Sequence, residues 1–117
     1  MSTLKIDWPD YLRVHAGRAN LLIHLLAVPL FVVSVVSVPL YLVAGDPVSA
    51  MVAVALCIVA MVLQGRGHRL EAEPPRPFNG PGDFARRWFT EQFVTFPLFV
   101  ISGRWWRQFR QHGNHPS

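Results

Sequence analysis

A long apolar stretch interrupted by one short turn constrains the fold of this chain more than any other feature. Between residues 21 and 63 there is no Lys or Arg, and the sole acidic residue is Asp46, in the turn Gly45-Asp46-Pro47. Residues 21–44 are long enough to cross roughly 30 Å of hydrocarbon, and residues 47–63 reach the lower limit of such a span. The stretch therefore predicts two antiparallel helices joined at this turn.

The amino-acid composition favours a membrane-embedded protein over a water-soluble one. The chain of 117 residues is 51% hydrophobic and only 15% charged, which is unusual for a soluble domain of this size. Residues 48–62 include Ser49 as their only polar residue, so this helix lacks the polar face that a soluble helix presents to water. We therefore expect one membrane-embedded helical domain over residues 1–117. A soluble bundle with a very apolar core is the alternative.

The positions of the charged residues indicate how the chain is oriented in the membrane and which class of partner it meets. All eleven Lys and Arg residues lie outside residues 21–63, so the positive-inside tendency puts both chain termini in the cytoplasm. The net charge of +4 does not indicate nucleic acid, because the cations flank apolar helices and several adjoin tryptophans, as in a lipid headgroup zone. The lone Cys57 excludes a disulfide or a multi-cysteine metal site within the chain.

Capping residues and prolines predict an all-α fold. We expect a first helix over residues 9–44, capped by Asp7 and kinked at its two internal prolines. Asp46 followed by proline predicts the start of a second helix, over residues 47–73. The first two helices form the hairpin.

The remaining third of the chain predicts a loop and two more helices. Residues 73–82 are rich in proline and glycine and predict a shaped loop. An aromatic-rich third helix over residues 84–102, capped by Asp83 and kinked near Pro97, has too short an apolar part to cross a bilayer. We expect it to be re-entrant or packed against the hairpin, followed by a short basic amphipathic helix over residues 104–111.

Histidines bracket the apolar stretch at matched positions. His24 and His68 stand 22 residues before and after Asp46, so in an antiparallel hairpin both lie roughly 33 Å from the tip. His15 stands nine residues before His24, which on an ideal helix puts the two on opposite faces, roughly 13 Å apart along the axis. They can share one ion only if the helix bends at Gly17.

Other polar residues share helix faces with these histidines. Tyr11 with His15 and Asn20 with His24 are spaced i, i+4, and His68 with Glu71 is spaced i, i+3, so each pair shares one face. Two or three imidazoles with a carboxylate suit non-haem Fe(II), and zinc accepts the same donors. The alternatives are a haem-binding carrier with His24 and His68 as axial ligands, and a structural or partner-binding hairpin with interfacial histidines.

Two further residues carry alternative interpretations. Glu91 either pairs with Arg87 at i, i+4, which we favour narrowly, or faces the histidines as a supporting acceptor or a further ligand. Arg86 either holds a substrate carboxylate or is a cation facing solvent or headgroups.

Motifs spread over most of the chain carry a resemblance to a known family. They are Tyr11-x3-His15-x4-Asn20-x3-His24-x4-Pro29, Gln64-x2-Gly67-His68-x2-Glu71 and Pro74-Pro75-x-Pro77-Phe78-x-Gly80-Pro81. Together they resemble the small membrane-protein family typified by the fungal Fe(II)-dependent 2-hydroxy fatty acid dioxygenase, and the last motif is similar to its bacterial branch.

The resemblance implies an integral protein of the bacterial inner membrane that uses Fe(II) and O2 to shorten a 2-hydroxy fatty acid by one carbon. His15, His24 and His68 would be the iron ligands. Glu71 would complete or support the ligand shell, and Asn20 and Glu91 would orient the ligands. Tyr11 and Arg86 are the candidate substrate-binding residues. The expected partners are the membrane, O2 and a lipid-like substrate, with a homo-oligomer allowed and nucleic acid excluded.

Overall fold

The computed structural model describes residues 6–112, and every regular element in that range is helical. In chain order the elements are α1 (Trp8–Val14), α2 (Arg18–Val43), α3 (Pro47–Arg69), α4 (Pro81–Thr90), the π-helical segment η2 (Glu91–Thr95), α5 (Phe96–Ile101) and α6 (Arg104–His112). The all-α prediction is confirmed.

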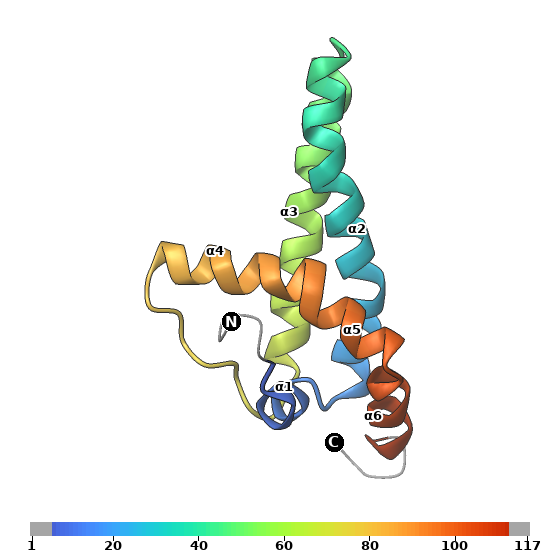
Figure 1. Ribbon diagram of the computed structural model, residues 1–117, viewed down its shortest axis with the longest axis vertical. Coiled ribbons are helices and arrows are strands. Elements are labelled where there is room, and N and C mark those ends of the chain that lie inside the picture. Colours follow the sequence, from blue (N-terminus) through green and yellow to red (C-terminus); the bar gives the residue numbers. More distant parts are fainter. Residues whose placement is uncertain (1–5, 113–117) are drawn as a thin grey trace.

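Helices α2 and α3 form a long antiparallel hairpin that projects beyond the rest of the molecule (Figure 1). At its tip Gly45 has φ of +75°, a conformation that glycine adopts without a Cβ clash. The Asp46 carboxylate then accepts hydrogen bonds from the N–H and the hydroxyl of Ser49, which caps α3 as predicted. Pro29 and Pro39 lie inside α2 and do not end it.

Small side chains line the face of α3 that packs against α2. Its buried residues are Ala50, Ala53, Ala60, Gln64 and Gly67, which recur at intervals of three, four or seven. Alanine and glycine at these intervals let two helix backbones approach closely, as in packed membrane helices. Packing in the outer half of the hairpin therefore depends on close backbone contact more than on large interlocking side chains.

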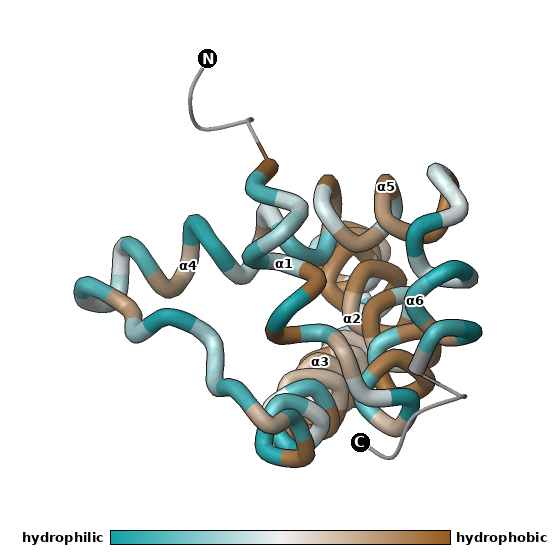
Figure 2. Tube along the Cα trace, turned by 90° about the horizontal axis from the view of Figure 1, so that it is seen from below, coloured by the Kyte–Doolittle hydropathy of each residue, from teal (hydrophilic) through white to brown (hydrophobic). Residues whose placement is uncertain are grey.

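The outer surface of the hairpin is apolar. Both helices are long and apolar enough to cross a membrane, with mean hydropathies of 2.6 and 2.3 over their most apolar windows. Only 33% and 28% of those windows are buried inside the protein, and exposed side chains such as Val43 and Met51 are apolar. Figure 2, seen along the hairpin from below, shows hydrophobic colouring over much of α2 and α3 and hydrophilic colouring over much of α4 and the loop before it.

The other helices gather around the end of the hairpin away from its tip, called here the base. A buried cluster of apolar side chains joins them there, comprising Tyr11, Leu21, Val28, Phe96, Phe99 and Trp105. The Trp105 indole N–H donates to the carbonyl of Leu21, which fixes the C-terminal region to α2. As expected, the aromatic third segment packs against the hairpin, with α4 extending sideways from it (Figure 1).

Three predicted boundaries differ from the structure. The single helix expected over residues 9–44 is divided into α1 and α2 by a break at residues 15–17, and α3 ends at Arg69, short of residue 73. The third helix begins at Pro81, so Asp83 lies in its first turn, where its carboxylate accepts from the Asn79 N–H. The break before α2 has the largest consequence, because it determines where His15 lies.

Candidate metal centre

Three histidines from separate elements converge at the base. His15 is the C-cap of α1, His24 lies in α2 and His68 lies in α3, and one ring nitrogen from each falls within 4.8 Å of the others. The ring centroids are 4.7 to 5.1 Å apart and the rings meet edge to face, at 80° to 81°. The prediction that His24 and His68 lie at one level of the hairpin is confirmed.

Backbone carbonyls orient two of these rings. The Nδ1 atom of His15 lies 2.8 Å from the carbonyl oxygen of Tyr11, and Nδ1 of His24 lies 3.0 Å from that of Asn20. A carbonyl only accepts a hydrogen bond, so each Nδ1 carries the hydrogen and each Nε2 keeps its lone pair. Both Nε2 lone pairs are therefore directed at the space between the rings.

The nitrogens facing this space lack hydrogen-bond partners within residues 6–112. His15 Nε2, His24 Nε2 and His68 Nδ1 are all buried and unpartnered. Buried polar atoms without partners are costly, and lone pairs directed at one another would be stabilised by a cation between them. A transition metal fits, because neutral imidazole is a preferred ligand for iron and zinc and carbonyl-held Nδ1–H groups are the usual outer support.

A carboxylate closes the fourth side of this space. Glu91 Oε2 lies 3.3 Å from His15 Nε2 and 4.0 Å from His24 Nε2. The Tyr11 hydroxyl donates to the same oxygen at 2.9 Å, while its ring stacks on His15 with centroids 3.9 Å apart. Because neither Glu91 Oε2 nor the adjacent histidine lone pair carries a hydrogen, a shared cation would stabilise this contact as well.

The protonation states of Tyr11 and Glu91 suit this arrangement. Burial alone would raise the pKa of Glu91, but the Tyr11 hydroxyl that donates to its carboxylate favours the ionised form, as would a cation held by the histidines. Burial raises the pKa of Tyr11 well above 10, and the Glu91 charge and hydrogen bond raise it further. Glu91 is therefore an anion, and Tyr11 remains a hydrogen-bond donor.

Glu71 explains why the first helix breaks beside His15. Its Oε1 accepts from the backbone N–H groups of Ala16 and Gly17 at 3.0 and 2.9 Å, and its Oε2 accepts from Asn20 Nδ2 at 2.7 Å. The carboxylate caps the N-terminus of α2, whose first turn has no acidic residue of its own. The chain changes direction at Gly17, and His15 reaches the same side of α2 as His24.

Of the two roles expected of Glu71, to complete the ligand shell or to support it, the structure favours the second, because its carboxylate does not reach the histidines. Both of its oxygens accept hydrogen bonds from N–H groups, so Glu71 acts on the centre indirectly, by holding Ala16, Gly17 and Asn20 in place. Asn20 has the orienting role expected of it, because its carbonyl holds His24 and its side chain holds Glu71. A Cβ on Gly67 would lie 2.2 Å from Asn20 Oδ1, so glycine alone leaves room for this amide.

The pairing expected between Arg87 and Glu91 is wrong. Arg87 donates to the carbonyls of Arg76 and Pro77, at 2.8 and 3.0 Å, and lies 3.5 Å from an oxygen of Asp83. Arg87 thus fastens the proline-rich loop to α4 and leaves Glu91 to the histidines. Arg86 also pairs with Asp83, at 2.6 Å, and its side chain is 52% exposed.

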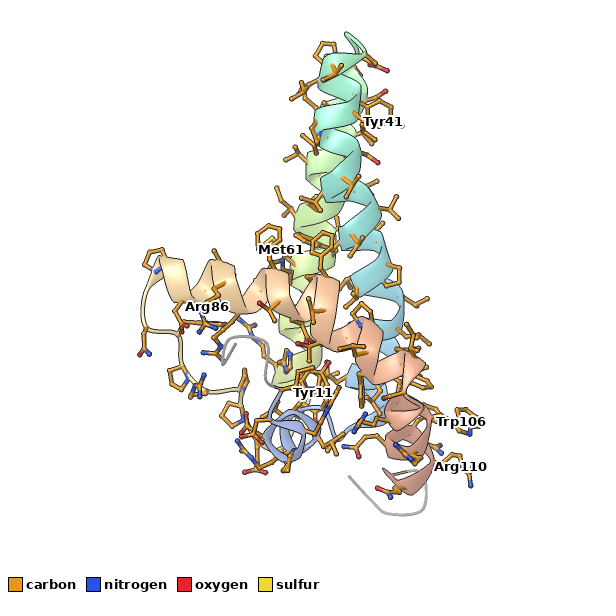
Figure 3. The ribbon with its side chains drawn as sticks, viewed as in Figure 1. Tyr11, Tyr41, Met61, Arg86, Trp106 and Arg110 are labelled. Carbon is orange, nitrogen blue, oxygen red and sulfur yellow. The ribbon has the colours of Figure 1, made fainter. Side chains whose placement is uncertain are left out.

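A cavity of about 820 Å³ opens onto the three histidines and Glu91. Tyr11 from α1, Met61 from α3 and Arg86 from α4 all line it, and Figure 3 labels these three side chains. The lining also includes the apolar side chains of Phe78, Phe84, Trp88 and Val94 and the charged ones of Arg69, Arg76 and Arg87, so apolar and polar walls meet in this cavity. Trp88 Nε1 is buried and has no partner within the described range. The size and lining are those of a site for a small organic ligand.

Two polar residues received no role from the sequence, although Gln64 stands in one of the motifs quoted above. Gln64 and Gln92 are both buried and hydrogen-bond to each other directly above the centre. The available signal was a glutamine one helical turn before His68, at the end of an apolar run, and a second glutamine beside Glu91 in an aromatic helix. Each is too common on its own to indicate a contact between them.

Comparison with known proteins finds no relative of this chain. No family model, no curated protein and no solved structure matches the chain. Functional inference therefore depends on the geometry of the centre and on the motifs in the sequence.

Proposed function

We propose that this chain is an integral membrane enzyme that binds Fe(II) through His15, His24 and His68, with Glu91 as the adjoining carboxylate. The observation that carries the proposal is the convergence of three unpartnered imidazole nitrogens within 4.8 Å. Such a donor set leaves coordination positions free on iron, which is the arrangement that oxygen-dependent non-haem iron enzymes use. The haem alternative is less well supported, because the third imidazole crowds the space that a macrocycle would need.

The substrate proposed is a 2-hydroxy fatty acid, shortened by one carbon. One molecule of the hydroxy acid and one of O2 give the shorter fatty acid, CO2 and water, so no further reductant is needed. Bound Fe(II) would supply the activation of O2 and a binding point for the carboxylate and 2-hydroxyl oxygens. The substrate class derives from the family resemblance, and the cavity supports it by joining the histidines to apolar walls.

The residues of the chain have separate parts in this proposal. The three histidines and Glu91 hold the cation, and Tyr11 holds Glu91 through its hydroxyl. Arg86 lies at the exposed rim of the cavity, where its guanidinium can attract the substrate carboxylate after exchanging its contact with Asp83. The apolar walls exclude water from the acyl chain.

Membrane residence suits such a substrate. The apolar hairpin would place the centre near one lipid headgroup layer, since the centre lies at the base and the arginines and tryptophans of α6 lie there too. An amphiphile would then present its polar head to the histidines while its chain remains among apolar side chains. We propose the inner membrane of a bacterium with both termini in the cytoplasm.

The test is metal analysis and product analysis of the detergent-purified protein. After anaerobic purification with Fe(II), we expect one iron per chain, and in air a 2-hydroxy fatty acid should yield the acid one carbon shorter, detected by mass spectrometry. Changing His15, His24 or His68 to alanine should abolish both. Ser37→Ala, on the hairpin outside the cavity, is the control. Undiminished iron in all three histidine variants would refute the ligand assignment, and bound iron without a shortened product would refute the reaction.

A further inference from the structure

Two buried glutamines form a closed pair just above the metal centre. Gln64 Nε2 donates to Gln92 Oε1 at 2.9 Å, and Gln92 Nε2 donates to Gln64 Oε1 at 2.7 Å. Their exposed fractions are 1% and 0%. Each amide satisfies the other's donor and acceptor, so the pair is stable without water and fixes the separation of the two backbones that carry it.

The pair connects two elements that carry candidate ligands. Gln64 lies one helical turn before His68 on α3, and Gln92 directly follows Glu91 in η2. Within residues 6–112 it provides the only side-chain hydrogen bonds between α3 and the segment α4–η2–α5. Of the other hydrogen bonds at the base, one reaches Glu91 from Tyr11 of α1, and another joins the start of α2 to Glu71, just beyond the end of α3. Without the glutamines, no hydrogen bond sets the distance from Glu91 to α3.

The backbone conformation around Gln92 is a second reason to assign the glutamine pair a role at the site. Residues Glu91–Thr95 are π-helical, and the Phe96 N–H bonds to the carbonyl of Glu91. A π segment is less favourable than continuous α-helix and occurs mainly where a site requires a residue to be redirected. Here it allows successive residues to face different partners, with Glu91 toward His15 and Gln92 toward α3.

We propose that the Gln64–Gln92 pair is a positioning device that holds the Glu91 carboxylate at a fixed place relative to His68 and thereby sets the geometry of the bound metal. Neither glutamine belongs to the proposed ligand set, although Gln64 also lines the cavity. This inference rests on the proposed metal centre and extends it to residues outside the ligand set.

The experiment uses Co(II), whose visible absorption reports coordination geometry, bound to the full chain in detergent. The variants are Gln64→Leu, Gln92→Leu and the double Leu/Leu variant, which leaves no amide without a partner and preserves side-chain volume. We expect each single variant to weaken Co(II) binding by about 10- to 100-fold, the range typical of outer-shell partners, and to change the absorption bands. The double variant should be no worse than either single variant, because each substitution already removes the whole pair.

Ser34→Ala is the matched control, since Ser34 is also buried in the hairpin but lies ten residues beyond His24. It should leave both affinity and spectrum unchanged. A double variant with unchanged affinity and spectrum, even at a lower melting temperature, would show that the pair only fastens helices and would overturn the positioning role. Failure of the unsubstituted chain to bind Co(II) would instead overturn the metal centre, and the positioning role with it.

Discussion

The two ends of the hairpin are stabilised by different kinds of interaction. Toward the tip, α2 and α3 meet through small buried residues such as Ala50 and Ala53, while their outer faces are apolar and exposed. At the base, buried or partly buried polar side chains are linked by hydrogen bonds, as in the Gln64–Gln92 pair and the contacts of Glu71. The difference shows that the chain concentrates its directional interactions where the histidines meet. Changes at the base should therefore alter metal binding, and changes at the tip should alter stability alone.

The largest expected effect is that of His24→Ala. His24 is fully buried, and its Nε2 is one of the three converging nitrogens. Removing a direct ligand should weaken metal binding by more than the about 10- to 100-fold that the loss of an outer-shell partner costs. Metal content after dialysis measures the effect, and the exposed tip variant Val43→Ala should retain full content. Equal loss in both variants would mean that metal content reports general unfolding, and the contrast between base and tip would fail.

The second largest effect is expected for Glu71→Ala. The substitution leaves the N–H groups of Ala16 and Gly17 without their acceptor, which should cost about 3 kcal/mol of unfolding free energy and release His15 from the centre. Chemical unfolding in detergent and Co(II) titration measure these two effects. Glu73→Ala is the control, because its ion pair with Arg13 is exposed and should contribute at most about 1 kcal/mol. Similar losses for both variants would contradict the capping role of Glu71.

The sequence predicted features that depend on local pattern and helix geometry. Hydrophobicity and the cap at Asp46 predicted the hairpin, and equal spacing about the turn predicted that His24 and His68 share a level, because each residue adds a fixed rise. A bend at Gly17 was one of two alternatives, and the sequence alone could not decide between them, because the break is stabilised by Glu71, which approaches from beyond the C-terminus of α3.

The partner of Glu91 was also beyond the reach of local rules. Spacing alone favoured Arg87, but the carbonyls of Arg76 and Pro77 and the Asp83 carboxylate hold that arginine. These contacts depend on the path of a loop that composition identified as irregular without giving its shape. Local pattern thus gave the helices and the three histidine candidates, while the choice between the two interpretations of Glu91 required the tertiary structure, which places it beside His15.

Two neighbouring glycines of α3 provide a test of how closely the helices pack at the base. A Cβ on Gly67 would lie 2.2 Å from Asn20 Oδ1, whereas a Cβ on Gly65 would meet nothing within 4 Å. Gly67→Ala should therefore cost about 2 kcal/mol and weaken metal binding by displacing Asn20 from Glu71 and His24. Gly65→Ala should be neutral or stabilise α3 by up to about 1 kcal/mol, since alanine is the better helix former. Thermal unfolding and Co(II) titration of the two variants measure the difference, and indistinguishable variants would contradict the close approach of the helices here.

The smallest effect is expected at the tip, for Gly45→Ala. Gly45 has φ of +75° with no atom near the position of a Cβ, so the substitution introduces backbone strain and no clash. The cost should be about 1 kcal/mol, the lower end of the penalty for a left-handed L-residue. Because no buried hydrogen bond of the base depends on the turn, Co(II) affinity and absorption should match those of the unsubstituted chain. Weaker binding with an altered spectrum would show that the tip transmits its conformation to the histidines, and the hairpin would then have to be treated as one rigid unit whose two ends are coupled.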